Sequence, residues 1–371
     1  MHITQLNISN VRNLLGTSLL PCKNGNFIFG ENGSGKSSLL ESIFLISRGK
    51  SFRARDIRTV ISESATDCIV YSIIQNCEEM PNSIGVKRCV KGSLEAKCDG
   101  IRIKSSAELS ALVPLQLVDS NSFDLVDGSP SARRKFLDWG VFHVEHLYSG
   151  AWSSFQKALK QRNYALKYES GANLTVWNNE LSRLNKIVTD FRETYLLDFV
   201  SFLQSAFNRY EPLKDIELEY NRGWAKDEAF EDILIRNEAT DRLLGYTSSG
   251  AHKADLSIGI GKIKARDKLS RGQTKLLVYA LKLAQGELFK KLTGKKCIYI
   301  LDDLPSELDE INKMLVFEHL ADLDCQFFVT GVDKSDFLSH LPKKTCKMFH
   351  VEQGNITCLL YTSDAADEDC W

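Results

Sequence analysis

The amino-acid sequence predicts an α/β fold built from two lobes, with a short helical arm inserted between them. Three observations lead to this prediction. Residues 26–29 form an apolar run before a glycine-rich loop, and residues 297–301 form a second apolar run that ends in two aspartates. Apolar runs of this length are typical of buried parallel strands. Between them, residues 174–195 carry apolar side chains at alternating spacings of three and four, which predicts a long helix.

Length and composition exclude several classes of protein. The chain has 371 residues, 43% hydrophobic and 26% charged, which predicts two or three folded domains rather than a disordered chain. No apolar run reaches the roughly eighteen residues of a membrane-spanning helix. The start of the chain lacks the basic and apolar segments of a secretory signal. We therefore expect a cytoplasmic protein with no membrane partner.

The cysteine count bears on the redox state of the chain, and the charge count bears on its possible partners. The ten cysteines include no Cys-x-x-Cys pair and match neither a disulfide framework nor a zinc site, so we expect reduced thiols. The chain has 47 basic and 48 acidic residues, a net charge of −1. Taken alone, that balance argues against a surface that binds phosphate.

The loop after the first apolar run matches the phosphate-binding pattern G-x4-G-K-[ST]. Its glycines let backbone N–H groups turn inward around phosphate oxygens, and its lysine adds a positive charge. Its serine hydroxyl can join the shell of Mg²⁺, and the helix that follows contributes the partial charge of its N-terminus. A chance glycine-rich turn is the alternative, disfavoured by the strand before and the helix after. The predicted cofactor-binding residues are Gly30, Glu31, Asn32, Gly33, Ser34, Gly35, Lys36, Ser37 and Ser38, with Lys36 also catalytic and Ser37 also a metal ligand.

The second apolar run places two carboxylates at the end of a predicted central strand. Open α/β sheets bind ligands at the carboxyl ends of their strands. We assign Asp302 to Mg²⁺, and Asp303 to catalysis through the water that attacks the phosphate. The alternative is a solvated strand end, which the phosphate loop makes the less favoured interpretation.

Between these strands, Leu269 to Gln273 read Leu-Ser-Arg-Gly-Gln and open a long helical pattern. This segment resembles the signature motif of ABC-type ATPases, which caps the γ-phosphate bound by the opposite subunit of a dimer. Residues 306–309 resemble the D-loop of the same class. The resemblance implies an ABC-type head in two lobes and adds Ser270, Arg271, Gly272, Gln273 and Asp309 to the cofactor-binding residues. For Ser270 alone, a plain helix N-cap is the alternative.

The helical pattern between the lobes predicts a hairpin. Residues 152–166 form its first half, the turn is expected at residues 169–173, and a helix is expected over residues 174–208. The apolar seam of the second half repeats like a heptad. Its members are Leu174, Trp177, Leu181, Leu184, Val188, Phe191 and Tyr195.

With these motifs in place, the chain up to about residue 357 resembles the RecF family, compact relatives of SMC and Rad50 proteins. The P-loop is shared by many families, whereas the Pro-x-x-Arg-Arg-x-x-Leu-Asp block and Ser-Arg-Gly-Gln are more specific. The matching segments are residues 10–13, 49–53, 128–138, 161–163, 241–256, 269–273 and 301–309. By this resemblance Arg12 and Asn13 join the cofactor-binding residues.

The resemblance implies a weak ATPase with ATP and Mg²⁺ as cofactors, in which hydrolysis to ADP and phosphate acts as a conformational switch. It further implies an ATP-dependent homodimer on double-stranded or gapped DNA. With RecR and RecO, such a protein helps load RecA onto single strands coated by SSB and supports SOS induction. Two alternatives stay open: another SMC/Rad50-like ATPase that partners a nuclease, and a transporter-type ABC ATPase subunit.

Three positions depart from the expected pattern or leave it open. The family's Gly-Pro-His-Arg-x-Asp appears here as Gly250 to Asp255 with Lys253 in the arginine position, which loses bidentate geometry. No histidine follows residues 327–330, so Thr330 is the candidate for the switch position. Gln116 is a candidate for the metal-contacting glutamine of ABC-type heads, with an ordinary loop residue as the alternative.

Net charge hides three basic segments, at residues 48–58, 87–104 and 262–275. Such segments on an ABC-type head favour contact with a phosphate backbone, although any one of them can be a solvated face. The predicted DNA-binding residues are Arg53, Arg55, Arg58, Lys87, Arg88 and Lys104.

We expect four parts along the chain: a first ATPase lobe at 1–120, the arm at 121–211, a second lobe at 212–357, and a non-native tail at 358–371. The tail reads like the translation of a sequencing adapter, with a natural acidic tail as the alternative. It carries four acidic residues and no basic ones. Without it, 47 basic residues face 44 acidic ones, a net charge of +3 that no longer argues against a nucleic-acid partner.

Overall fold

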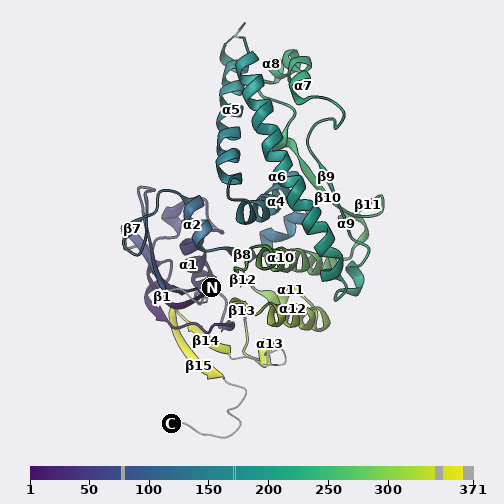
Figure 1. The fold of residues 1–371 in the computed structure, drawn as a ribbon. Coiled ribbons are helices and arrows are strands. Elements are labelled where there is room, and N and C mark those ends of the chain that lie inside the picture. The colour runs from purple at the N-terminus through teal and green to yellow at the C-terminus, as the bar shows by residue number, and fades with distance from the viewer. Residues whose placement is uncertain (77–79, 170, 172, 339–345, 362–371) are drawn as a thin grey trace, which may run out of the picture. The chain divides into compact units, whose positions relative to one another are not determined.

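The computed structural model describes residues 1–76, 80–169, 171, 173–338 and 346–361. Two compact units emerge from it (Figure 1). Unit 1 combines Met1–Ser122 with Lys275–Trp371, and unit 2 is Phe123–Thr274. The predicted turn of the arm lies partly outside the described residues, at 170 and 172, as do residues 362–371 of the predicted tail.

A mostly parallel sheet is the frame of unit 1. Its strand order is β15-β14-β3-β13-β12-β8, and only the β14–β15 pair is antiparallel. Both apolar runs that predict strands lie in it: β3 is Gly25–Phe29, and β12 is Ile298–Leu301, buried at every position. The remaining strands are β8 Leu115–Val118, β13 Phe327–Gly331, β14 Cys346–Glu352 and β15 Asn355–Tyr361. The last strand therefore continues to Tyr361, past the predicted end of the head at residue 357.

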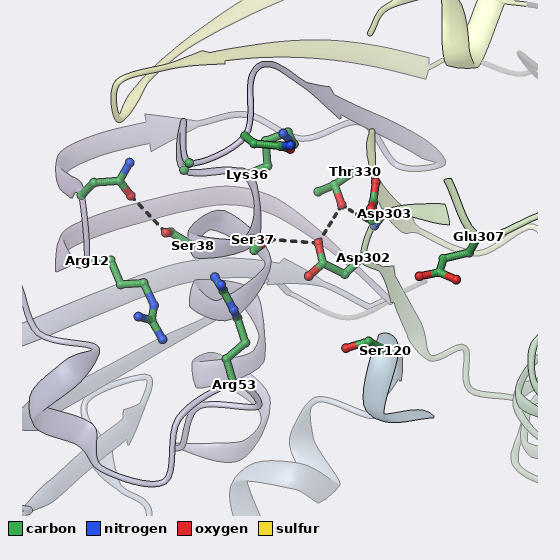
Figure 2. A pocket seen from close by; sticks show the side chains of 14 residues that line it. Arg12, Lys36, Ser37, Ser38, Arg53, Ser120, Asp302, Asp303, Glu307 and Thr330 are labelled. Atoms are coloured by element: carbon green, nitrogen blue, oxygen red, sulfur yellow. Dashed lines mark hydrogen bonds between the residues drawn. The ribbon is translucent and has the colours of Figure 1, made fainter. Parts of the chain in front are cut away.

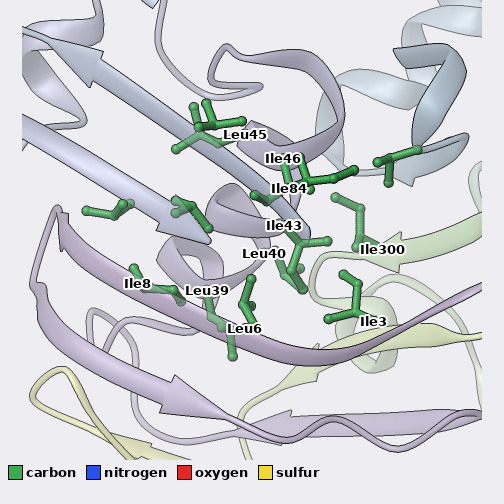
Figure 3. Close-up of a cluster of buried hydrophobic side chains, with 14 of the residues drawn as sticks. Ile3, Leu6, Ile8, Leu39, Leu40, Ile43, Leu45, Ile46, Ile84 and Ile300 are labelled. Atoms are coloured by element: carbon green, nitrogen blue, oxygen red, sulfur yellow. The ribbon is translucent and has the colours of Figure 1, made fainter. Parts of the chain in front are cut away.

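A second, antiparallel sheet completes unit 1, in the order β2-β1-β4-β5-β6-β7. Its strands are β1 His2–Val11, β2 Leu14–Leu19, β4 Asp67–Gln75, β5 Asn82–Cys89, β6 Leu94–Cys98 and β7 Ile101–Arg102. The helix α1, Lys36–Arg48, packs against both sheets. Figure 3 shows Leu39 and Ile43 of α1 in one buried cluster with Ile8 of β1 and Ile300 of β12.

The long helix α10, Arg271–Thr293, starts in unit 2 and continues into unit 1. Leu276, Leu277, Val278 and Tyr279 follow one another and are all buried, so this helix is covered on every side rather than amphipathic. The other helices of unit 1 are η1 Ile57–Thr59, α2 Ser106–Leu112, α11 Leu304–Glu307, α12 Glu310–Leu323 and α13 Ser335–Leu338, while η2 Ser120–Phe123 lies at the unit boundary.

Unit 2 contains the predicted hairpin. Its helices are α5, Tyr148–Tyr168, and α6, Thr175–Phe207, which at 33 residues spans roughly 50 Å. Five members of the predicted seam are buried: Leu174, Leu181, Leu184, Val188 and Tyr195. The other elements are α3 Asp124–Asp127, α4 Pro130–Val144, η3 Glu211–Leu213, β9 Glu217–Asn221, α7 Phe230–Arg236, α8 Glu238–Leu244, η4 Ala251–Lys253, β10 Asp255–Ile260, β11 Ile263–Lys264 and α9 Ala265–Lys268.

The boundary between the units falls at Thr274 rather than at residue 211, where the sequence places the start of the second lobe. Residues 212–274 group with the arm because β10 packs on α4 and pairs with β9. Arg133 of α4 also binds the Asp255 carboxylate of β10 through two hydrogen bonds of 2.7 and 3.1 Å. These partners are far apart along the chain, so no local pattern reveals them.

Buried arginines hold unit 2 together. The Arg162 guanidinium, fully buried on α5, donates to Asn178 Oδ1 at 2.8 Å and to Asp241 Oδ2 and Thr247 Oγ1 at 2.7 Å each. Arg192 of α6, also fully buried, donates to Asp138 and to the carbonyl oxygen of Ala251. The family-specific blocks at 128–138, 161–163 and 241–256 thus contribute to the interior of this unit.

Replacing Arg162 by methionine removes one partner of this buried ion pair and leaves the Asp241 charge desolvated. We expect the free energy of unfolding to fall by about 3–5 kcal/mol, measured by urea denaturation from the helical circular dichroism signal. The matched control is Arg183→Met, which removes an exposed pair with Glu180 on α6 and should leave the free energy of unfolding nearly unchanged. Equal losses in the two variants would contradict a stabilising role specific to the buried pair.

His252 introduces a dependence of stability on pH. Its Nε2 lies 2.9 Å from the Thr247 carbonyl oxygen, and burial lowers the pKa of the ring from 6.5 to about 4, an effect that the Thr247 carbonyl partly opposes. The folded chain therefore binds fewer protons than the unfolded chain between these values. Stability is present above pH 6.5 and is lost as the pH falls toward about 4.

His252→Gln should flatten this dependence, because glutamine can donate to the same carbonyl without titrating. Between pH 6.5 and 4, protonation of His252 should lower the free energy of unfolding of the wild-type chain by about 3 kcal/mol. Urea denaturation across the range measures it, with His146→Gln at an exposed site as the control. A slope that His252→Gln leaves unchanged would rule out His252 as its source.

Candidate functional site

A cavity of about 490 Å³ lies in unit 1 where the phosphate loop meets the carboxyl ends of the parallel strands (Figure 2). Ten predicted site residues line it: Arg12, Asn13, Asn32, Gly33, Gly35, Lys36, Ser37, Ser38, Asp302 and Asp303. Thr330, the switch candidate, lines it too. So do Arg53, Ser120 and Glu307, which were not assigned to a nucleotide site from sequence.

The glycines of the loop are required by its geometry. Gly30 has a φ of 151°, and a Cβ there would lie 2.2 Å from the carbonyl oxygen of Val351. The Lys36 ammonium donates to the carbonyl oxygens of Gly30 and Glu31 at 2.6 and 2.9 Å. Burial lowers the pKa of Lys36, while Asp303 and Asp302 oppose that shift. The loop thus presents one partly desolvated cation near two carboxylates.

Asn13 fixes the loop from the turn between β1 and β2. Its Nδ2 donates to the Ser34 carbonyl oxygen at 2.8 Å, and its Oδ1 accepts from the Ser38 hydroxyl at 3.0 Å. A Cβ on Gly35, whose φ is 124°, would lie 2.9 Å from Asn13 Nδ2. The close approach of the Asn13 side chain to the loop therefore requires a glycine at position 35.

Glu41 organises the positive side of the cavity. This fully buried carboxylate on α1 accepts from the Arg12 guanidinium and from the Ser51 hydroxyl. Ser51 Oγ in turn accepts from the backbone N–H of Arg53 at 3.0 Å. The position of the Arg12 side chain and, through Ser51, that of the Arg53 backbone thus depend on one buried carboxylate. The sequence signal for Glu41 is an acidic residue among the apolar residues of a predicted buried helix.

Asp302 and Ser37 form the corner where a divalent cation could bind. The Ser37 hydroxyl donates to Asp302 Oδ1 at 3.1 Å, and the Thr330 hydroxyl donates to the same oxygen at 2.8 Å. Burial raises the pKa of Asp302, while the bonds from Thr330 and Ser37 and the charge of Arg53 oppose that rise. A partly desolvated carboxylate beside a hydroxyl matches the oxygen donor set that Mg²⁺ prefers.

Asp303 has an unusual backbone conformation for a residue with a side chain, with a φ of 57°. Its amide donates to Thr330 Oγ1 at 2.7 Å, and its carboxylate accepts from the Ser306 hydroxyl at 2.6 Å. Strain of this kind persists where the surroundings fix it, often at functional sites. Beside it, the Glu307 carboxylate pairs with Lys275 of α10.

The predicted signature lies outside this cavity. Ser270 Oγ accepts from the amide of Gln273 at 3.3 Å, and Gln273 Oε1 accepts from the amide of Ser270 at 3.0 Å. This reciprocal capping box starts α10. Ser270 is thus a helix N-cap in the structure, which is the alternative given for it from sequence. Arg271 and Gly272 form the first turn, and all four residues belong to unit 2. Asp309 caps α12 by accepting from the Asn312 amide at 2.9 Å and does not line the cavity.

Gln116 is neither a loop residue nor a lining residue of the cavity. It is buried inside β8, where its Nε2 donates to Gln285 Oε1 at 2.8 Å. The residue after β8 that lines the cavity is Ser120. Among the loop residues, Gly30, Glu31 and Ser34 do not line it, and Gly30 and Glu31 bind Lys36 through their carbonyl oxygens.

The residues predicted to bind DNA have several different environments. Arg53 lines the cavity beside the phosphate loop. Arg58 pairs with Asp56 at 2.6 Å, and Lys87 pairs with Asp67 at 3.1 Å. Arg55 and Lys104 are exposed, and Arg88 is partly buried with its Nε covered. Arg48, counted in the first basic segment, donates to Ser110, and burial lowers its pKa to about 10.

Within the described part of the chain, no helix combines the length and the apolar character needed to cross a bilayer. The same residues contain no cluster of three or more histidine, cysteine, aspartate or glutamate side chains able to hold a metal ion.

Comparison with known proteins identifies the family. Residues 2–357 match the family described as RecF/RecN/SMC N terminal domain. The protein "DNA replication and repair protein RecF" of Shewanella baltica (strain OS185) is 38% identical over 360 residues, 97% of this chain and 100% of the relative. Its namesake from Stutzerimonas stutzeri (strain A1501) is 39% identical over 362 residues, 97% of this chain and 98% of the relative.

Solved structures agree with the sequence relatives. Those of the recombination mediator protein RecF-ATP and RecF-ATPrS in the RecFOR pathway match with TM-scores of 0.86 and 0.85 at 25% identity. They cover 96% of this chain and 97% and 98% of those chains. An Smc head bound to the C-winged helix domain of ScpA, at 14% identity and a TM-score of 0.60, shares the fold. The chain belongs to the RecF family and has the ABC-type head fold that its motifs predict.

Proposed function

We propose that this chain is an ATP-dependent DNA-binding protein of recombinational repair and replication-fork maintenance. The observation that carries the proposal is the contact of Ser37 with Asp302 in a cavity lined by the phosphate loop. Relatives named as DNA replication and repair proteins, and RecF structures with ATP, support it. ATP is the expected substrate and Mg²⁺ the expected metal.

In this proposal Lys36 exchanges the carbonyl oxygens of Gly30 and Glu31 for phosphate oxygens when ATP binds. Arg12 and Arg53 face the same cavity and add positive charge for the nucleotide. Mg²⁺, when bound, neutralises part of the phosphate charge, and Ser37 and Asp302 would hold it. The raised pKa of Asp302 supports this assignment, because a carboxylate desolvated by burial gains most from a cation.

Hydrolysis to ADP and phosphate depends on a positioned water. Asp303, whose backbone conformation is fixed by Thr330, is the proposed residue that orients and deprotonates it. Its carboxylate also accepts a hydrogen bond from the Ser306 hydroxyl, which holds it in place. Slow turnover would suit a switch between two states rather than metabolic conversion.

Closure of two heads would complete each site. Ser270, Arg271, Gly272 and Gln273 of one subunit would cap the γ-phosphate held by the other, with Asp309 at the same interface. Because DNA and ATP both favour the closed dimer, each increases the affinity for the other. The consequence is a DNA-stimulated ATPase that recognises gapped DNA. With RecR and RecO, it acts at single-strand gaps to help load RecA onto SSB-coated strands.

Lys36→Arg tests the phosphate loop. Arginine keeps the charge but cannot occupy the compact position of the ammonium, so ATP affinity should fall about 10- to 100-fold. ATP-dependent dimerisation, measured by analytical ultracentrifugation, should be lost. Lys295→Arg at an exposed site should behave like the wild type. If Lys36→Arg dimerises with ATP and hydrolyses it normally, the assignment of the phosphate loop is wrong.

Ser270→Arg tests the proposed cap supplied by the second subunit. The affinity for ATP should stay within about twofold of the wild type, whereas dimerisation and hydrolysis should be lost. Ser105→Arg is the matched control, because Ser105 caps α2 in the same way and its loss costs about 1 kcal/mol of stability without touching the signature. Normal dimers of Ser270→Arg would refute the cap, while the phosphate loop could still be correct.

A further inference from the structure

The three basic segments of the sequence have different environments in the structure. In the first, Arg48 is largely buried, Arg53 lines the nucleotide cavity and Arg58 pairs with Asp56. In the second, Lys87 pairs with Asp67, whereas Lys91, Lys97, Arg102 and Lys104 are exposed. In the third, Lys262, Lys264, Arg266 and Lys268 are all exposed on consecutive elements of unit 2. We call these four residues the hairpin patch.

The hairpin patch surrounds a tight two-residue turn at the protein surface. Strands β10 and β11 are antiparallel, with Ile260 opposite Ile263, so the loop between them has only two residues. Gly261, the first of them, has a φ of 58°, as two-residue hairpins require. Lys262 is therefore at the tip of the hairpin, and β11 is an edge strand of its sheet.

A small cavity of about 80 Å³ lies beside the hairpin and is lined in part by Arg133, Asp255, Ser257, Lys264 and Arg266. The Arg133 charge is already balanced by Asp255 at 2.7 Å. The positive charges of Lys264 and Arg266 are left to face the cavity, and the Ser257 hydroxyl adds a hydrogen-bonding group. Arg266 pairs with Asp267 at 3.4 Å, and both side chains are about half exposed, so that pair contributes little.

The size and charge of this cavity select its ligand. Pockets for small molecules usually measure about 300–1,000 Å³. A cavity of about 80 Å³ can take one phosphate group but not a nucleotide. Glu217 and Glu219 lie on β9, on the other side of β10 from β11. A polyanion would therefore follow β11 and α9, away from β9.

We propose that the hairpin patch binds the sugar–phosphate backbone of duplex DNA, and that Ser257, Lys264 and Arg266 take one backbone phosphate in the small cavity. The inference rests on the proposed function, and of the three basic segments it selects 262–275, which contributes none of the six residues predicted from sequence to bind DNA. Contacts of this kind carry no base specificity and position the protein on the duplex. They also release counterions, so binding weakens steeply with salt.

The test compares Lys264→Gln/Arg266→Gln with the wild type. Fluorescence anisotropy of a labelled duplex, with saturating ATP and Mg²⁺, gives the affinity between about 50 and 200 mM salt. Each lost phosphate contact reduces the slope of log K against log salt by about 0.9, so the double variant should lose about 1 to 2 in slope. DNA affinity should fall about tenfold or more at the lower salt. The matched control is Lys157→Gln/Lys160→Gln, which removes two exposed lysines from α5.

A second variant keeps the test valid if the first folds poorly. Lys262→Glu lies at the exposed tip of the hairpin and should lower DNA affinity with no change in the unfolding transition. Lys268 and Arg271 are left unchanged because they flank Ser270. In both variants, ATP affinity and ATP-dependent dimerisation should stay within about twofold of the wild type.

Three outcomes would overturn the inference. Wild-type DNA affinity and salt slope in both variants would show that the patch makes no backbone contact. A loss of ATP affinity without a loss of DNA binding would make the patch a nucleotide contact. A loss in the α5 control equal to that in Lys264→Gln/Arg266→Gln would reflect net charge alone. If the wild type fails to bind duplex DNA with ATP, the proposed function itself is wrong.

Discussion

The contact of Ser37 with Asp302 depends on the order of the strands in the parallel sheet. The two residues are 265 positions apart, and they follow β3 and β12, which are separated by β13. Thr330 of β13 occupies the space between and bonds to Asp302 Oδ1 at 2.8 Å. Three parallel strands, each buried on both faces, thus bring a helix N-terminus, a carboxylate and a hydroxyl to one edge. The cavity exists because this edge is where parallel strands end.

Buried charge supports both units in different ways. In unit 1, the buried Glu41 carboxylate accepts hydrogen bonds from both Arg12 and Ser51, so it links two segments beside the cavity. In unit 2, Arg162 and Arg192 bond to side chains and carbonyl oxygens from several helices and loops. Buried ion pairs of this kind are costly to break, although they add little net stability over apolar packing. Their larger contribution here is geometric, since each fixes segments that have no common secondary structure.

Sequence patterns predicted the parts of the fold that depend on local chemistry. The apolar runs at 26–29 and 297–301, the phosphate loop and the heptad seam of α6 all report burial or backbone geometry directly. The antiparallel sheet of unit 1 was not predicted, because its alternating strands give weak signals. Gln116 was a candidate by its position along the chain, with a loop residue as the alternative, but it lies in β8 and its side chain donates to Gln285. Arg53 was assigned to DNA by charge, whereas its place in the cavity depends on Ser51 and Glu41. Such placements are set by tertiary contacts that no local pattern contains.

The hydroxyl of Thr330 has a consequence for how this corner responds to its surroundings. It bridges Asp302 and the amide of Asp303 through one uncharged group. A histidine in this place would gain or lose a proton near pH 6.5 and carry that change into both aspartates. Threonine cannot titrate, so the response of this corner to acid is left to Asp302, whose pKa is raised by burial. Acidification therefore acts on the carboxylate itself and not on the hydroxyl that links the two aspartates.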